Sequence, residues 1–278
     1  MTLPILRFHR VALGTTFEIR LAGESSADYA AEALESVWDA LAHVAQELDA
    51  DQSGSALDAS HRMVAGERLR IPPHLRACLD LAARLQRATA GALDISVPLQ
   101  AERSAWMEAR AAAWRLEGSD LICEQPGWQF DFGDLARGHA LDKMAEVLRE
   151  WGLAKALITA GGGLALAVAA PDHAEGWKMA AGSTTFLLAD GAMASFGGRH
   201  PASATDPRLG QRVQLPKPYR ALAHSAAEAA GWARALAAAT PAEVALWVAQ
   251  EPIIGLWTAD EQRLGMAARL AVLNEPHS

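Results

Sequence analysis

The sequence predicts a fold of the α+β class, in which helices and strands alternate along the whole chain of 278 residues. Three observations support this prediction. Apolar residues recur at helical spacing in several long segments, shorter apolar or alternating segments are typical of strands, and glycines and prolines separate the two kinds. The length allows one large domain or two intimate halves, and because no clear linker interrupts the chain we expect a single domain over residues 1–278.

The N-terminal third begins with a strand and continues with two helices. Residues 11–21 alternate loosely, as a half-buried strand does. From Asp28 onward the apolar residues follow helical spacing for about five turns, which predicts an amphipathic helix. A polar loop over residues 49–60 follows. A second helix is expected over residues 73–90, where Gly91 ends it.

The middle of the chain alternates between strands and helix. We expect a strand over residues 93–97 and short strands with glycine-containing turns over residues 114–132. Apolar residues on one side predict a helix over residues 138–151. Residues 155–170 contain two apolar strands, joined by the glycine triplet 161–163, where the backbone can turn sharply or approach a ligand closely.

The C-terminal part is expected to be irregular first and regular afterwards. Residues 191–210 have no clear periodicity and end in a turn. Two helices are predicted over residues 224–239 and 241–250. A closing hairpin is then expected, with strands at residues 253–258 and 264–268.

Composition and charge exclude several classes of protein. Hydrophobic residues make up 51% and charged residues 21%, which is typical of globular proteins rather than disordered or membrane-embedded ones. The 25 basic and 33 acidic residues give a net charge of −8, which disfavours nucleic acid or an anionic membrane as a partner. Cys78 and Cys123 are too few for a disulfide scaffold. Without a secretory signal or an apolar segment of membrane-spanning length, we expect a cytoplasmic protein.

Five short motifs follow one another along the chain. They are LGTTF at residues 13–17, GALDISVPL at 91–99, DFGDLARGHALD at 131–142, ITAGGG at 158–163 and DPRLG at 206–210. In this order they resemble the patterns of the ApbE-type FAD:protein FMN transferase family. Each motif alone is modest, but five in the correct order over essentially the whole chain make the resemblance specific.

This resemblance implies a fold, a reaction and a set of ligands. The family fold is a layered αβαβα arrangement with a cleft between two halves that binds FAD. In family members a magnesium ion on the diphosphate assists the transfer of FMN to a threonine hydroxyl of an acceptor flavoprotein, with release of AMP. The positions that the resemblance assigns to flavin binding here are Leu13, Gly14, Thr15, Ala92, Leu93, Asp94, Arg137, Gly138, Gly161, Gly162 and Arg234.

The predicted metal site departs most from the family. The family pattern A-D-A-x-x-T places an aspartate and a threonine on one helix face, where both supply oxygen ligands to magnesium. In this sequence the two positions are Ala230 and Arg234. Alanine has no oxygen, and arginine carries a fixed positive charge that repels a cation. We therefore expect no magnesium site of the family type, and assign no metal ligand and no catalytic residue.

Two interpretations of Arg234 remain open. As a lone arginine on an alanine-rich helix it can extend to solvent, which is the usual arrangement. Alternatively its guanidinium can take the place of the metal and bind the FAD diphosphate through two hydrogen bonds. Arg137 likewise has two interpretations, since it can pair with Asp134 or contact the flavin. Asp131 and Asp142 are expected to shape turns and helix starts.

Other side chains of the family chemistry also differ. His139 replaces an aromatic residue, and Ser203 replaces a histidine of the H-x-[IL]-D-P pattern. His139 and His200 are candidate proton carriers, although a lone histidine is more often packed or solvated. Three functions remain: an FMN transferase with a modified site, a protein that binds FAD or another nucleotide without transfer, and a scaffold without ligand. The missing aspartate and threonine favour weak or absent magnesium-dependent transfer.

Overall fold

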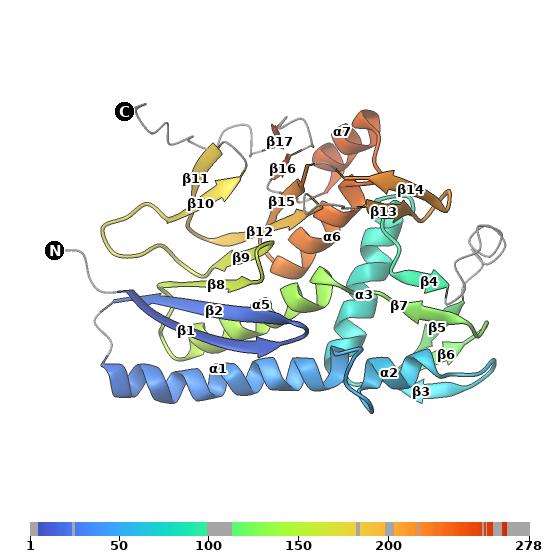
Figure 1. The fold of residues 1–278 in the computed structure, drawn as a ribbon, viewed down its shortest axis with the longest axis horizontal. Helices are drawn as coiled ribbons and strands as arrows, with labels where there is room; N and C mark the ends of the chain where they lie inside the picture. Colours follow the sequence, from blue (N-terminus) through green and yellow to red (C-terminus); the bar gives the residue numbers. More distant parts are fainter. Residues whose placement is uncertain are drawn as a thin grey trace.

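The computed structural model describes residues 5–23, 26–98, 113–181, 184–197, 203–215, 217–251, 253, 255–257 and 263–265. Within these residues eight strands form a central sheet in the order β1-β2-β8-β9-β12-β15-β16-β17, and each neighbouring pair is antiparallel (Figure 1). The strands are β1 (Ile5–Ala12), β2 (Thr15–Ala22), β8 (Ala156–Ala160), β9 (Leu164–Ala167), β12 (Gly191–Phe196), β15 (Tyr219–Ala223), β16 (Gly255–Trp257) and β17 (Arg263–Gly265).

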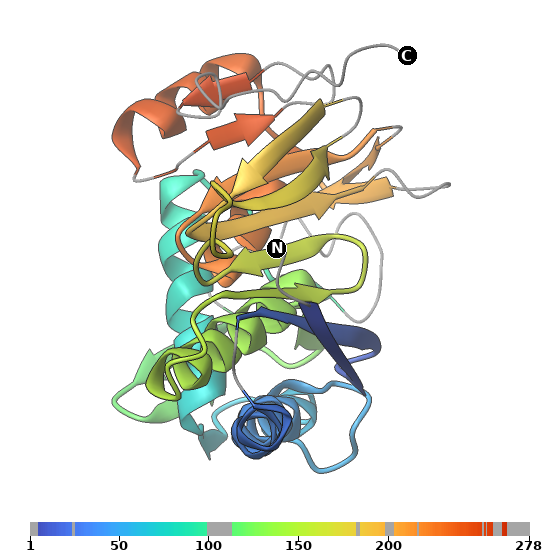
Figure 2. The same cartoon turned by 90° about the vertical axis from the view of Figure 1, so that its left-hand side faces the viewer.

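Helices cover one face of this sheet. Figure 2 shows the longest of them, α1, end-on beside the sheet. Helix α5 contacts β8 and β9, and helix α6 contacts β12 and β15, so these two helices lie next to each other on the sheet. The described helices are α1 (Ala27–Leu48), α2 (Ala56–His61), α3 (Pro73–Ala88), α5 (Asp134–Glu150), α6 (Ala226–Leu236) and α7 (Pro241–Gln250).

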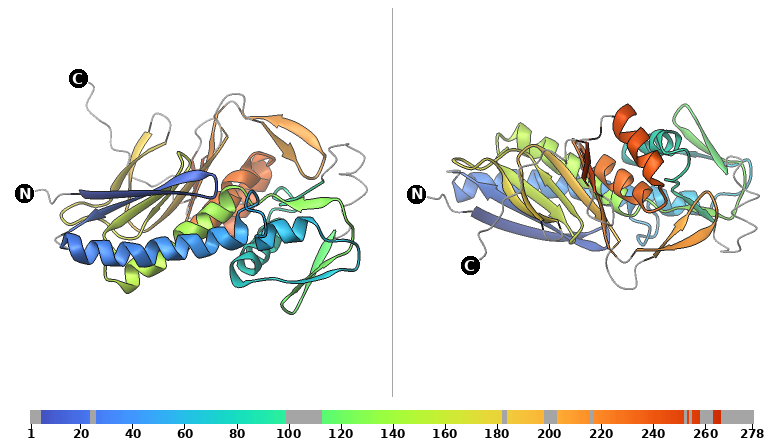
Figure 3. Two further views of the ribbon diagram at one scale, coloured as in Figure 1. Left: turned by 60° about the horizontal axis from the view of Figure 1, so that its bottom comes forward. Right: turned by 90° about the horizontal axis from the view of Figure 1, so that it is seen from above.

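Smaller sheets surround this central unit (Figure 3). The hairpin of β10 (Trp177–Ala181) and β11 (Thr184–Leu188) packs Trp177 and Phe186 against Trp257, in an apolar cluster separate from the main core. The remaining strands are β3 (Arg68–Arg70), β5 (Trp114–Glu117) and β6 (Asp120–Cys123) in one sheet, β4 (Ser96–Pro98) with β7 (Trp128–Phe130), and β13 (Ser203–Asp206) with β14 (Gln211–Gln214).

Helices α5 and α6 meet at very short range. A Cβ added to Gly138 would lie 2.6 Å from the backbone of Ala226, so only glycine allows this approach. One turn further along α5, the partly buried carboxylate of Asp142 accepts hydrogen bonds from Ser225 Oγ (2.7 Å) and from the backbone N–H groups of Ala226 (2.7 Å) and Ala227 (3.1 Å). Asp142 therefore satisfies the N-terminal donors of α6 and fixes its position on α5.

The α+β prediction is confirmed, and most helices lie where periodicity places them. Both strands around the glycine triplet, the short strands within 114–132 and α7 are also confirmed. Residues 255–257 and 263–265 form the predicted closing hairpin, whereas 258–262 and 266–268 are outside the described residues. No described helix is both long enough and apolar enough to cross a membrane.

Several local predictions are wrong. The expected strand over 11–21 is a hairpin, because Leu13 and Gly14 both adopt positive φ angles (48° and 68°) and reverse the chain. The polar loop 49–60 contains the start of α2, and the strand expected at 93–97 begins only at residue 96. Helix α5 starts four residues earlier than predicted. The segment 191–210, expected to be irregular, contains the central strand β12 and part of a hairpin.

Candidate functional site

Two adjoining cavities form a cleft beside α5 and α6. The first has a volume of about 680 Å³ and the second about 480 Å³. Both are lined by Asp134, Arg137 and Phe196, so they join at the first turn of α5 and the end of β12. Their sizes lie within the range of small-molecule and cofactor sites, about 300 to 1,000 Å³.

Four segments enclose the first cavity, and none is adjacent in sequence to another. They are the loop around Asp94, residues 131–137 at the start of α5, the β13–β14 hairpin, and the C-terminal half of α6 with the residues after it. The second cavity lies between the β1–β2 turn, the glycine triplet and the ends of β12 and β15. Thr15, Ser195 and Arg220 bring polar side chains to it.

Arg137 connects the two cavities. Its Nε donates to the carbonyl of Leu13 (3.0 Å), and its Nη1 forms an ion pair with Asp134 Oδ1 (2.8 Å). The pairing with Asp134, one of the two expected arrangements, is therefore present. Gly14 lies close by, since a Cβ at this position would be 3.6 Å from Arg137 Nη2. The tight β1–β2 turn thus supplies a carbonyl that orients the guanidinium along the cleft.

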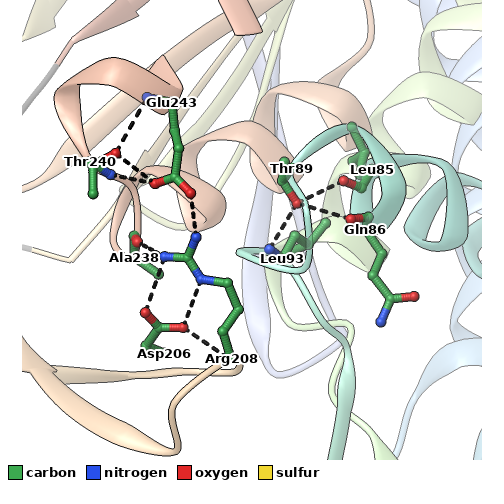
Figure 4. A network of polar contacts seen from close by, with 9 residues as sticks. All are labelled: Leu85, Gln86, Thr89, Leu93, Asp206, Arg208, Ala238, Thr240 and Glu243. Atoms are coloured by element: carbon green, nitrogen blue, oxygen red, sulfur yellow. Dashed lines mark hydrogen bonds and ion pairs between the residues drawn. The ribbon is translucent and has the colours of Figure 1, made fainter. Parts of the chain in front are cut away.

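The loop that carries Asp94 is held by a buried threonine. Thr89 at the end of α3 donates its hydroxyl to the carbonyl of Leu85 (2.8 Å) and accepts the backbone N–H of Leu93 (3.0 Å), as Figure 4 shows. These bonds fix Ala92, Leu93 and Asp94, all of which line the first cavity. The sequence motif therefore specifies a turn with a defined shape rather than the strand expected there.

Asp94 itself is a partly buried carboxyl group in the cleft wall. It accepts hydrogen bonds from Gln86 Nε2 (2.8 Å) and from the backbone N–H of Ser96 (2.8 Å). Burial raises the pKa of Asp94 above its usual value, and the hydrogen bonds and the charge of Arg234 act in the opposite direction. The carboxyl group is thus close enough to Arg234 to respond to its charge.

Arg234 lines the first cavity from the last turn of α6. Its Nη1 donates to the backbone carbonyl of Asp131 (2.7 Å), and its Nη2 lies 3.1 Å from Asp131 Oδ2. The side chain is only 23% exposed, so it does not extend from a fully solvated helix face. Of the two interpretations of this residue, the structure agrees with a guanidinium placed in the cleft.

The residues at the expected metal position do not fit a magnesium ion. Ala230 lines the first cavity but has no side-chain oxygen, and one turn further along the helix the guanidinium of Arg234 brings a positive charge. Throughout the described part of the chain, no group of three or more histidine, cysteine, aspartate or glutamate side chains could hold a metal ion. Hard cations require several oxygen ligands, and this helix face supplies none.

The β13–β14 hairpin forms the opposite wall of the first cavity. Arg208 in its turn pairs with both carboxylate oxygens of Asp206 (3.1 Å each) and with Glu243 Oε1 of α7 (2.5 Å), and it also donates to the carbonyl of Ala238 (Figure 4). Glu243 in turn caps α7 through Thr240. This partly buried network fastens the hairpin to the segment that joins α6 and α7.

The histidine positions give two further findings. Ser203, where the family pattern has histidine, lines the first cavity and accepts a hydrogen bond from Arg212 Nε (2.8 Å). His139 is buried under α3, with its Nε2 3.1 Å from His74 Nδ1, and lines neither cavity. Burial above all, then the charge of His74 and of Lys143, lowers the pKa of His139 to about 4. His200 lies outside the described residues.

Most predicted site residues lie at the cleft, and three do not line it. Leu13 and Gly14 support Arg137 from the β1–β2 turn, while Gly138 packs against α6. The prediction missed Arg220 and Ser195, because β15 and β12 were not recognised as strands. The predicted residues that line the first or second cavity are Thr15, Ala92, Leu93, Asp94, Arg137, Gly161, Gly162 and Arg234.

The fold and site together define an α+β protein with a two-part ligand cleft beside a helix pair. The family model described as the ApbE family matches residues 13–256. The chain therefore belongs to the ApbE family, which confirms the resemblance seen in the motifs. A search of curated proteins found no match.

Solved structures of similar fold cover nearly the whole chain. The flavinyl transferase ApbE of Pseudomonas stutzeri in its apo form has a TM-score of 0.77 at 18% identity, over 97% of this chain and 98% of that one. The flavin transferase ApbE of Vibrio cholerae has a TM-score of 0.74 at 18% identity, over 98% of each chain. The ApbE protein of Thermotoga maritima has a TM-score of 0.77 at 14% identity, over 94% of this chain and 97% of that one.

Proposed function

We propose that this protein binds a flavin nucleotide, FAD, in the two-part cleft, and that magnesium-dependent transfer of FMN is weak or lost. Membership of the ApbE family supports FAD as the ligand. The two adjoining cavities offer an elongated site, suited to a ligand with two ring systems joined by a diphosphate. Backbone groups of the glycine triplet and the hydroxyl of Thr15 add hydrogen-bonding capacity at one end.

The single observation that carries this proposal is the position of Arg234. Its guanidinium lies in the first cavity, one helical turn from Ala230, where family members have their metal ligands. A planar guanidinium can donate two parallel hydrogen bonds to phosphate oxygens, and these charge-assisted bonds are stronger than neutral ones. We infer that Arg234 contacts the diphosphate directly and neutralises part of its charge.

The same substitution argues against efficient transfer. Cleavage of a phosphoanhydride is accelerated by positive charge on the oxygens that gain negative charge, and an arginine can supply some of this. An arginine does not lower the pKa of a bound hydroxyl as a coordinated cation does. Ser203, which stands at the family histidine, is also a poorer proton acceptor than imidazole at neutral pH. We therefore propose an acceptor flavoprotein as a partner only for the weak transfer of FMN that the protein retains.

The proposal is tested by measuring FAD binding to the purified protein. The absorbance spectrum first shows whether a flavin copurifies. Calorimetric titration with FAD, FMN and riboflavin then measures which part of the ligand is recognised. We expect FAD to bind more tightly than riboflavin, because only FAD brings a diphosphate to Arg234. Equal, weak binding of all three would support the alternative of a scaffold without a nucleotide ligand.

A further inference from the structure

Asp131 contacts Arg234 in two ways that have different consequences. Its backbone carbonyl accepts a hydrogen bond from Nη1 (2.7 Å), which fixes the guanidinium without changing its charge. Its carboxylate lies 3.1 Å from Nη2 and forms an ion pair, which neutralises that charge. The first contact belongs to the backbone, whereas the second depends on the side chain alone. A single substitution can therefore separate them.

Two carboxylates of the first cavity act on Arg234. Asp131 and Asp94 line the same cavity, and the charge of Arg234 acts on Asp94. The side chain of Asp131 is 51% exposed, so it can turn toward solvent at little cost, whereas the partly buried Asp94 is held by Gln86 and Ser96. An anionic ligand that approaches Arg234 competes with the Asp131 carboxylate for Nη2.

We propose that the Asp131–Arg234 ion pair is an autoinhibitory contact, in which the carboxylate competes with an anionic ligand for Arg234 and is displaced when a group such as a diphosphate binds. This inference rests on the proposed function, since it takes the anionic part of a flavin nucleotide as the competitor. A neutral ligand gains nothing from displacing the carboxylate. The ion pair thus lowers the affinity of the cleft for phosphorylated ligands and leaves its affinity for neutral ligands unchanged.

The test is an Asp131→Asn variant, which removes the charge and keeps the backbone carbonyl and the size of the side chain. We measure binding of FAD, riboflavin and inorganic pyrophosphate by calorimetry at low ionic strength. FAD and pyrophosphate should bind about five- to tenfold more tightly than to the unaltered protein, the scale of one screened charge interaction near a protein surface. Riboflavin binding should stay the same. The gain should shrink at high salt.

Two further variants serve as controls. Glu117→Gln removes the same charge from β5, which lines neither cavity, and should leave all three affinities unchanged. The double variant Asp131→Asn with Arg234→Ala should lose the gain, because the arginine through which the carboxylate acts is absent.

The outcomes separate the two proposals. If the unaltered protein binds FAD and the Asp131→Asn variant binds it no more tightly, the competition is disproved and the proposed function stands. A gain that is equal for riboflavin also overturns the competition. Binding of FAD by the variant alone supports the competition and overturns the proposed function. Absence of FAD and pyrophosphate binding in both proteins overturns both proposals.

Discussion

Two helix ends meet at the cleft and present different chemistry. Helix α5 points its N-terminus at the first cavity, with Gly133 as N-cap and no side chain capping it, followed by Asp134 and Arg137. Helix α6 points its C-terminal half at the same cavity, with Ala230 and Arg234. A helix N-terminus carries partial positive charge and a C-terminus partial negative charge. The α6 end favours an anion only because it carries Arg234.

The two helix ends also differ in the contacts that hold them in place. Residues 134–138 of α5 are tied to other parts of the molecule, through Arg137 to the β1–β2 turn and through Gly138 to α6. On the cleft-facing side of α6, Gly231 packs against Leu85 of α3, and Arg234 contacts Asp131. The comparison teaches that the cleft-facing turn of α5 is fixed by contacts with other elements, whereas the positive charge that α6 brings to the cavity comes from one side chain, Arg234.

The largest expected effect comes from breaking the α5–α6 contact. Gly138→Ala should lower the free energy of unfolding by about 3 kcal/mol, because the new Cβ would lie 2.6 Å from backbone atoms that cannot move aside. This loss outweighs the gain of about 1 kcal/mol that alanine normally brings to a helix. Urea denaturation measures it. Glu146→Ala on the exposed side of α5 is the matched control and should change stability by less than about 0.5 kcal/mol.

The buried side of α5 predicts a dependence of stability on pH. The pKa of His139 is lowered to about 4 in the folded protein, from 6.5 when unperturbed, so the folded state binds fewer protons than the unfolded state between these values. Stability should therefore decrease as the pH falls from about 6.5 toward 4, by up to about 3 kcal/mol. His139→Phe cannot be protonated and should flatten this part of the pH profile. If the pH profile of stability were the same in this variant as in the unaltered protein, the dependence on pH would come from other groups.

The α6 end is tested by removing its charge. Arg234→Ala should weaken FAD binding by about 1.5–3 kcal/mol, the scale of a charge-assisted hydrogen bond, with riboflavin unaffected. Arg234→Lys should recover only part of the affinity, because lysine keeps the charge and loses the planar fork. The loss should decrease with salt. Equal affinity of the alanine variant and the unaltered protein would leave the guanidinium with a structural role only.

The smallest change is expected on adding magnesium, which should not alter the affinity for FAD. Calorimetry with magnesium and with a chelator should give the same affinity for FAD, since neither Ala230 nor Arg234 supplies an oxygen. The double variant Ala230→Asp with Arg234→Thr restores two oxygen ligands on adjacent turns and should acquire magnesium-dependent AMP release with a threonine-bearing acceptor. Ala230→Asp alone keeps the guanidinium and serves as the control. Clear tightening by magnesium in the unaltered protein would show another metal site.

Local sequence signals predicted much of the fold. The long apolar period of α1 and the capping box of α7 depend on residues within a few positions, and both helices lie where expected. The ion pair of Arg137 with Asp134 spans three positions and was one of the expected arrangements. Strand β12 was missed because its residues 191–194 are all buried and show no alternation, as expected for a strand paired on both sides.

The key contact of the site could not be predicted in the same way. Arg234 and Asp131 are 103 positions apart, and nothing in either segment indicates the other. The motifs placed both residues near one cleft, but only the folded chain shows that the carboxylate pairs with this arginine. Likewise, the motif assigned Gly138 to flavin binding but gave no sign that it packs against Ala226 of α6, which the folded chain shows.

The β13–β14 hairpin forms one wall of the cleft and is not part of the central sheet. Its two strands pair with each other in a sheet of their own, and Arg208 fastens the turn to α7 and to the end of α6. Segments of this kind open by local unfolding at a lower free energy than the whole domain. Amide hydrogen exchange in β13 and β14 should therefore be faster than in β12 or β15.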